Sequence, residues 1–205
     1  MAALSFVRRS KWLSVALLGL LLGVGLQLMS RRNSFEAPAA RDGTALPSGP
    51  EIVFLYLGSA ACAYSDETEN IETVARAKGL LSGTAREEGF GFSTHGIATD
   101  SDLGSGLAHL AKLGAWDEVS LGRSWANSDA IRHFFQGSLK PVVTPGIVVF
   151  FRRMEPELRA DGLLTGYRIL RGRVLMRAYG IREIKEWVGN GAPVSLDGLE
   201  AVEPP

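Results

Sequence analysis

The chain has 205 residues, which is enough for one hydrophobic core of ordinary size but not for two large ones. Its formal charge is zero, yet the first 32 residues hold five cations and no acid, so residues 33–205 carry 17 basic against 22 acidic side chains. A mildly acidic body gives no electrostatic basis for binding nucleic acid. The single cysteine, Cys62, excludes an intramolecular disulfide.

An uncharged apolar run lies near the start of the chain, from Trp12 to Met29. Its 18 residues are about the minimum for a helix that spans a bilayer, and cations bracket it. A cleaved signal peptide is the alternative, but the nearest small-x-small site, Ala37-Pro38-Ala39, lies well behind the run. We therefore expect an uncleaved anchor over residues 1–32 that meets the lipid bilayer through residues 12–29.

The orientation of this single-pass anchor follows from the charges around it. Three cations precede the apolar run and two follow it, which favours a cytoplasmic N-terminus and a body exported to the periplasmic or extracellular face. Residues 33–50 are rich in Ala, Pro, Gly and Ser and predict a flexible tether. We expect the folded domain over residues 51–189 and a loose C-terminal tail over residues 190–205.

The folded domain is predicted to open with a strand at residues 51–58, because "EIVFLYLG" is short and apolar throughout, as buried strands are. A helix from Ala63 to Lys78 follows, with acids in its first turns and Gly79 as its stop. A second strand at 90–100 leads into a helix over 101–116. The leucines expected to face inward from that helix are Leu103, Leu107, Leu110 and Leu113.

The second half of the domain predicts an inserted strand and helix, then a β-rich region. The strand lies at 117–122, and the helix over 127–137 is capped by Asn127 or Ser128. The run Gly146 to Phe151 is a strand entered through Thr144-Pro145, and a hairpin is expected to turn at Arg171-Gly172. An amphipathic helix at 181–189 closes the domain.

Nine of the 17 cations of the body fall between Arg152 and Lys185, in the β-rich region. We interpret them as solvated strand faces rather than as an anion-binding patch. The order of elements, parallel βαβ units followed by an antiparallel hairpin, predicts an α/β fold with a mixed sheet covered by helices on both faces.

This order, with Cys62 opening the first helix of the body and Thr144-Pro145 just before a late apolar strand, resembles the thioredoxin-like superfamily. The resemblance spans residues 51–189. It implies that Pro145 is a cis proline beside Cys62 and that Thr144 aligns an extended polypeptide substrate. It also implies that the sequence Cys62-x-x-Ser65 occupies the place of the family's redox motif.

Three departures from the family pattern bear on its chemistry. Ala61 stands where thioredoxins have tryptophan, and Tyr56 stands where they have a buried acid that assists proton transfer. Ser65 replaces the second, resolving cysteine. Monothiol glutaredoxins also read C-x-x-S, but their glutathione-binding features are not found here, and a peroxiredoxin would need a proline where Leu55 stands.

The reactivity of Cys62 remains open at this stage. A helix N-terminus lowers the pKa of a thiol, and Ser65 one turn on would donate a hydrogen bond to the thiolate. Acids at Asp66, Glu67 and Glu69, with no cation within ten residues, act against ionisation. A buried, inert cysteine is the alternative interpretation.

No cofactor or metal is expected. The three histidines, His95, His109 and His133, have no ligand spacing to one another or to Cys62, and we interpret them as surface or core residues. The sequence also has no phosphate-binding or dinucleotide-binding glycine motif.

Two functions therefore stand. The first is a membrane-tethered monothiol oxidoreductase, in which Cys62 and Ser65 form the catalytic site and Thr144 and Pro145 bind a protein disulfide substrate. The second is a redox-inactive binding module, an accessory subunit that contacts another membrane protein through its groove or through residues 116–136.

Overall fold

The computed structural model describes residues 48–199, so the predicted anchor, most of the tether and the last six residues of the tail lie outside the described residues. Within residues 48–199, five strands form one sheet in the order β3-β2-β1-β4-β5. Strands β1, β2 and β3 are parallel, and β4 and β5 are antiparallel to their neighbours. The strands are β1 (Gly49–Gly58), β2 (Gly91–Ala98), β3 (Glu118–Ser120), β4 (Gly146–Leu158) and β5 (Leu164–Tyr179).

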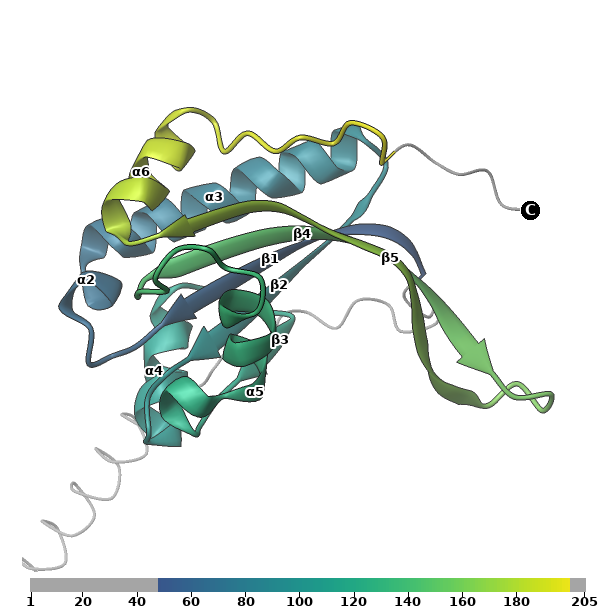
Figure 1. Ribbon diagram of the computed structural model, residues 1–205, viewed down its shortest axis with the longest axis horizontal. Coiled ribbons are helices and arrows are strands. Elements are labelled where there is room, and N and C mark those ends of the chain that lie inside the picture. Colours follow the sequence, from purple (N-terminus) through teal and green to yellow (C-terminus); the bar gives the residue numbers. More distant parts are fainter. Residues whose placement is uncertain (1–47, 200–205) are drawn as a thin grey trace, which may run out of the picture. The chain divides into compact units, whose positions relative to one another are not determined.

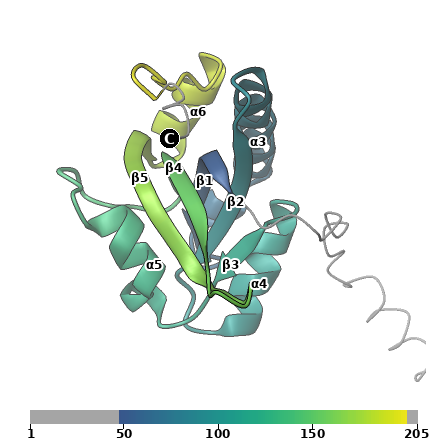
Figure 2. The ribbon, with the colours of Figure 1, turned by 90° about the vertical axis from the view of Figure 1, so that its right-hand side faces the viewer.

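Helices cover both faces of the sheet, as Figures 1 and 2 show. One face packs against α3, α4 and α6, and the other against α5 and η2. Within residues 48–199, none of the helices is both long enough and apolar enough to span a membrane. The helices are α2 (Ala63–Asp66), α3 (Thr68–Glu87), α4 (Leu103–Lys112), η1 (Ser124–Ala126), α5 (Ser128–Ala130), η2 (Ile131–Phe135) and α6 (Ile181–Gly189).

Strand β1 is apolar on both sides because both sides are covered. Successive side chains of a strand point to opposite faces, so Ile52, Phe54 and Tyr56 enter the core under α3, α4 and α6. The intervening Val53, Leu55 and Leu57 enter the second core under η2. The mixed sheet flanked by helices agrees with the predicted fold class, and β1 begins at Gly49, two residues before the predicted boundary.

Two helices differ from the prediction. The predicted helix 63–78 is instead the single turn α2 followed by α3, which runs through Gly79 to Glu87 because Leu81 and Ala85 continue its buried stripe. In α4 the predicted inward position of Leu103 and Leu107 is wrong, since both are exposed. Its buried side is made of a small residue, a polar one and one leucine: Gly106, His109 and Leu110.

The predicted turn at Arg171-Gly172 is also wrong. These residues lie inside β5 and pair with Arg153 and Arg152 of β4. The hairpin turns instead at residues 159–163, where Arg159 N donates to Leu163 O and Gly162 has a φ of +80°. The turn sits there because Gly162 accepts a left-handed backbone conformation at little cost.

The segment after α6 is packed, where the sequence predicted a loose tail. Ala192 and Leu199 are buried. The guanidinium of Arg173 donates to the backbone oxygens of Ser195 and Asp197 at 2.6 and 2.9 Å. Residues 190–199 thus belong to the folded body.

Gly58 allows a test of the packing at the end of β1. A Cβ at this position would lie 2.4 Å from Tyr56 Oη and 2.6 Å from His109 Nε2, both of which are buried. We expect Gly58→Ala to lower the free energy of unfolding by about 1–3 kcal/mol, as overpacking of a core does. Urea denaturation of the full chain in detergent measures the change.

Gly79→Ala is the matched control for this test. A Cβ at Gly79 has no neighbour within 4 Å, and the residue is exposed in the middle of α3. The control should raise the free energy of unfolding by up to about 1 kcal/mol through helix propensity. Equal effects of the two substitutions would contradict the packing described for Gly58.

Candidate functional site

Cys62 lies where the central strand β1 gives way to a helix. It is the N-cap residue of α2, is partly buried, and its backbone N donates to Ser59 O at 3.1 Å. Its own carbonyl accepts from Ser65 N at 3.0 Å, which closes the first helical turn. The Sγ atom therefore sits at the start of a turn whose first amides have no helical acceptor.

Thr144 and Pro145 lie beside Cys62 because β4 runs antiparallel to β1. Leu57 at the end of β1 pairs with Gly146 at the start of β4, so the residues just before β4 meet those just after β1. The Cys62 thiol donates to Thr144 O at 3.5 Å, and the Thr144–Pro145 peptide bond is cis. The structure thus places Cys62 and Ser65 close to Thr144 and Pro145, although 82 positions separate Cys62 from Thr144.

The thiol of Cys62 is poised toward ionisation. Partial burial raises its pKa, but the side chains of Ser65 and Thr144 and the backbone of Ser65 and Tyr64 lower it by more, so the pKa lies below that of an ordinary thiol. Ser65 Oγ is fully buried and has no hydrogen-bond partner among the described residues while the thiol is neutral. A thiolate at Cys62 would give this hydroxyl an acceptor.

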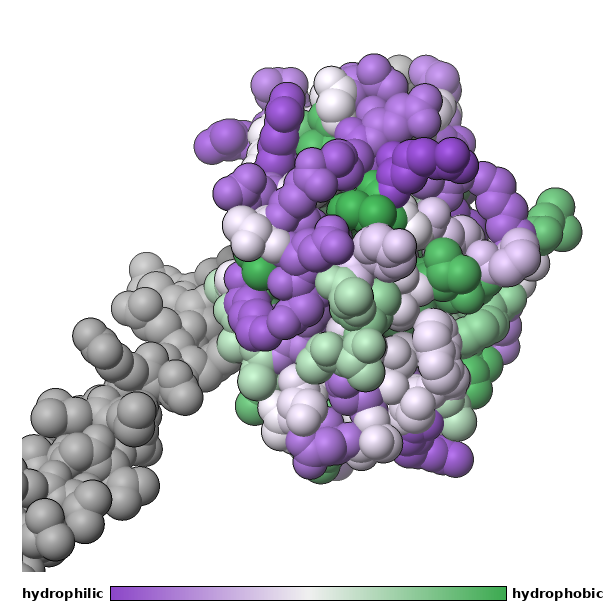
Figure 3. All heavy atoms as spheres, turned by 90° about the vertical axis from the view of Figure 1, so that its left-hand side faces the viewer, coloured by the Kyte–Doolittle hydropathy of each residue, from purple (hydrophilic) through white to green (hydrophobic). Residues whose placement is uncertain are grey.

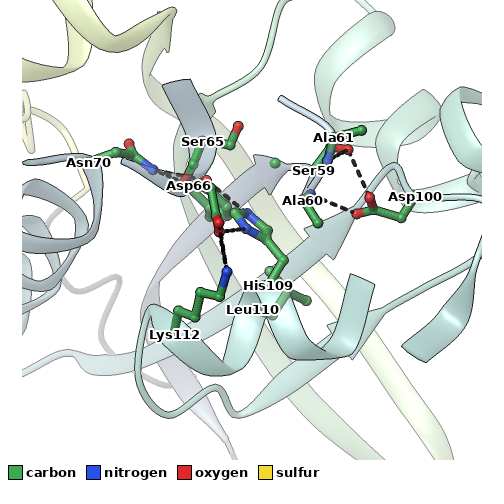
Figure 4. Close-up of polar contacts among 12 residues, drawn as sticks. Ser59, Ala60, Ala61, Ser65, Asp66, Asn70, Asp100, His109, Leu110 and Lys112 are labelled. Carbon is green, nitrogen blue, oxygen red and sulfur yellow. Dashed lines mark hydrogen bonds and ion pairs between the residues drawn. The ribbon is translucent and has the colours of Figure 1, made fainter. Parts of the chain in front are cut away.

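A buried polar cluster lies behind the site, and sequence reasoning missed it. Tyr56 Oη lies 3.2 Å from His109 Nε2 and accepts from Asn70 Nδ2 at 3.1 Å. His109 Nδ1 lies 3.3 Å from Asp66 Oδ1, and Lys112 Nζ donates to both oxygens of Asp66 at 2.6 and 2.7 Å. Figure 4 shows His109 and Lys112 reaching from one helix toward Asp66.

This cluster changes the electrostatic expectation for Cys62. The hydrogen bond and charge of Lys112 and the contact with His109 lower the pKa of Asp66, and the same contacts offset its negative charge. The repulsion expected from Asp66 is therefore reduced by Lys112, a cation remote in sequence, and by the contact with His109. The sequence holds one indication of this cluster, because His109 and Lys112 are three residues apart and therefore share a face of the predicted helix.

Tyr56 and His109 are both neutral groups at neutral pH. Burial raises the pKa of Tyr56, so its hydroxyl keeps its proton. Burial lowers the pKa of His109, and the contact with Asp66 only partly opposes this. The interior behind Cys62 therefore holds a neutral phenol–imidazole pair, where the resembled family has an ionisable carboxyl.

A cavity of about 650 Å³ opens beside Cys62. Its lining includes two acids: Asp100 accepts from Ser59 Oγ at 2.9 Å and from Ala60 N at 3.2 Å, and Asp102 caps α4 by accepting from Ser105 N at 2.7 Å. The cap lowers the pKa of Asp102. The remaining lining is small, polar or aromatic: Ser59, Ala60, Ala61, Cys62, Thr99, Ser101, Ser105, Ser124, Trp125 and Thr144.

A second cavity, of about 860 Å³, is also lined by Thr144. Tyr64 lines it too, together with residues of the loop before β4 and of the start of α6. Figure 3 views the body from the side that carries α2 in Figure 1; hydrophilic side chains gather toward the top of this face, and hydrophobic ones lie in its middle and toward the right. Thr144 is thus part of the lining of both cavities.

The other residues considered from sequence fall outside this site. No set of three or more His, Cys, Asp or Glu side chains within residues 48–199 is grouped to hold a metal ion. His95 lies 3.7 Å from Glu118 and 3.8 Å from Asp129, and its ring contacts that of His133. Only His109 takes part in the cluster behind Cys62.

The sheet order, the helices on its two faces and the cysteine opposite a cis X-Pro bond fit a thioredoxin-like fold. No family model and no curated protein matches the sequence. Solved structures similar to the chain include the C-terminal domain of a proposed thiol-disulfide oxidoreductase from Bacteroides thetaiotaomicron, with 14% identity and a TM-score of 0.32. That similarity covers 73% of this chain and 81% of the other.

A second solved structure is a secreted disulfide oxidoreductase of Mycobacterium tuberculosis, described as homologous to E. coli DsbE. It is 16% identical, with a TM-score of 0.30, over 70% of this chain and 81% of that one. Because both scores are low, the assignment of the fold rests on the strand order and the helix placement.

The lowered pKa of Cys62 predicts its reactivity. A thiol whose pKa is depressed is populated as thiolate at lower pH, so alkylation of the folded chain should reach its plateau at lower pH than alkylation of the urea-unfolded chain. Ser65→Ala should raise the midpoint pH of alkylation, and Ser82→Ala in α3 should leave it unchanged. Mass spectrometry of iodoacetamide labelling reports on Cys62 alone, because it is the only cysteine.

The acids that line the first cavity predict a charge preference. A cationic methanethiosulfonate should modify Cys62 several-fold faster than an anionic one, relative to the same ratio in the unfolded chain, because two carboxylates attract the cation. Asp102→Asn, which keeps a good helix cap, should lower the ratio of the cationic to the anionic modification rate. Asp161→Asn in the hairpin turn should leave this ratio unchanged. A ratio unchanged by Asp102→Asn would contradict this role.

Proposed function

We propose that the chain is a membrane-tethered thioredoxin-like protein that carries out monothiol thiol-disulfide exchange through Cys62. The observation that carries this proposal is the position of Sγ, 3.5 Å from Thr144 O at the rim of a polar cavity. The lowered pKa of Cys62 and the unpartnered Ser65 hydroxyl support it, because both favour the thiolate, which is the nucleophile.

The exchange has two steps. The Cys62 thiolate attacks one sulfur of a substrate disulfide, so that a Cys62–substrate disulfide forms and the other substrate sulfur leaves as a thiolate. A small thiol from solution then attacks the substrate sulfur of the mixed disulfide, which releases Cys62 as a thiolate and leaves the substrate joined to the small thiol. In this scheme Thr144 and Pro145 align the substrate, and Ser65 stabilises the thiolate.

The alternative function is a redox-inactive binding module that contacts a membrane protein. Its supporting observation is the apolar surface of the inserted segment, where Trp125 and Phe135 are exposed and stack edge-to-face with ring centroids 6.1 Å apart. In that case Cys62 would have no partner disulfide, and the inserted segment would carry the interaction.

Trapping of mixed disulfides in the native membrane separates the two functions. The membrane-bound chain with its thiol free should form covalent adducts that a reductant removes, and the Cys62→Ser variant should form none. A wild-type chain that forms no adduct, while its thiol stays accessible to alkylation, would argue for the binding module.

Replacement of Ser65 tests the missing half of a dithiol cycle. The unaltered chain should reduce insulin disulfides near background unless a thiol such as glutathione is added, because a serine oxygen cannot displace the mixed disulfide. Ser65→Cys should create measurable thiol-independent reduction, since a second thiol one turn away acts at a high effective concentration. Robust thiol-independent activity of the unaltered chain would overturn the monothiol scheme.

A further inference from the structure

The outer half of the β4–β5 hairpin extends beyond the rest of the sheet (Figure 1). Strand β1 pairs with β4 only as far as Met154, opposite Gly49. From Glu155 outward the two strands of the hairpin pair only with each other, up to the turn at residues 159–163. We call residues 154–169 the arm.

The arm has one apolar face. Paired residues of antiparallel strands point to the same side, and the pairs on this side are Met154–Ile169, Pro156–Tyr167 and Leu158–Leu164. The intervening pairs, Glu155–Arg168 and Glu157–Gly166, form a polar face. On that polar face Arg168 Nε donates to Glu157 Oε1 at 2.9 Å.

Within residues 48–199 most of the apolar face is exposed, and Met154 and Pro156 are half-buried. Leu158 is 52% exposed and Ile169 is 61% exposed, and Leu164 and Tyr167 are exposed as well. At the turn, Leu163 adds another exposed apolar side chain. A contiguous exposed apolar face marks a surface of interaction. In addition, a two-stranded hairpin that packs against nothing is only marginally stable in water.

The connection of the chain identifies the occupant. The arm itself holds two arginines against three acids, and both arginines pair with acids of the arm, so its charge does not select anionic headgroups. The chain enters the body at Gly49, opposite the base of the arm, and the 47 residues before the described part include the uncharged run Trp12–Met29. A segment predicted to enter the bilayer thus joins the body at the end that carries the arm.

We propose that the apolar face of the arm lies in the interface of a lipid bilayer. The proposal rests on the proposed membrane tether but not on the reactivity of Cys62. Cys62 follows the opposite end of β1, a strand of 10 residues. At about 3.3 Å a residue, β1 would hold the thiol roughly 30 Å from the base of the arm.

Depth-dependent quenching tests this proposal on the full chain. In a Cys62→Ser background, an environment-sensitive fluorophore is attached at Leu158→Cys, and the protein is reconstituted into vesicles of phosphatidylcholine and phosphatidylglycerol. We expect blue-shifted emission that doxyl-labelled lipids quench strongly and aqueous iodide quenches weakly.

Leu139→Cys supplies the matched control, because Leu139 is fully exposed in the loop before Thr144, away from the arm. Its label should emit as in water and be quenched by iodide. Equal iodide quenching at both positions would overturn the proposal. Protection of the Leu158 label from both quenchers, with crosslinking between copies, would assign the face to a second copy of the chain and would overturn it too.

The outcomes separate this proposal from the proposed function. If the labelled protein sediments with vesicles but lipid quenching is absent at Leu158→Cys, the arm contact alone is refuted. If the protein does not sediment with vesicles, both the tether and the arm contact are refuted. Alkylation of Cys62 in the unaltered chain reports on the thiol in either case.

Discussion

The antiparallel pairing of β4 with β1 is the constraint on which the rest of the structure depends. It places the Thr144–Pro145 bond beside Cys62, although 82 positions separate the thiol from the carbonyl it contacts. It also makes β1 an inner strand, paired with β2 on one edge and β4 on the other, and helices cover both of its faces. A slip of one residue in this pairing would turn Ile52, Phe54 and Tyr56 to the wrong core.

Features set by local pattern could be predicted from the sequence. The uniformly apolar run of β1, the cysteine at a strand-to-helix corner and the Thr-Pro before a late strand were enough for the fold class. The hairpin turn was not, because Arg171-Gly172 and Asp161-Gly162 both look like turns, and only pairing with β1 and β4 decides between them. In α4 the leucine spacing misled, since the sheet approaches so closely that only Gly106 fits against Ala98.

The chemistry of the site depends on contacts that no local pattern encodes. Asp66 reads as a repulsive neighbour of Cys62 in the sequence, yet Lys112 and His109 bind it from another helix. From the sequence, Tyr56 is known only as the residue that replaces the resembled family's buried acid, yet its hydroxyl joins His109 and Asn70 in a buried cluster. The result is a thiolate stabilised mainly by hydroxyls and amides, while the position of the resembled family's buried acid is held by the neutral Tyr56.

The position of Thr144 in the lining of both cavities has a consequence for the proposed exchange. Displacement at sulfur requires the incoming and departing sulfur atoms to lie on opposite sides of the atom under attack. In the proposed scheme the small thiol attacks while the substrate is still joined to Cys62, so the site has to admit both molecules at once. Two cavities that share Thr144 would let the substrate occupy one while the other stays open to the small thiol.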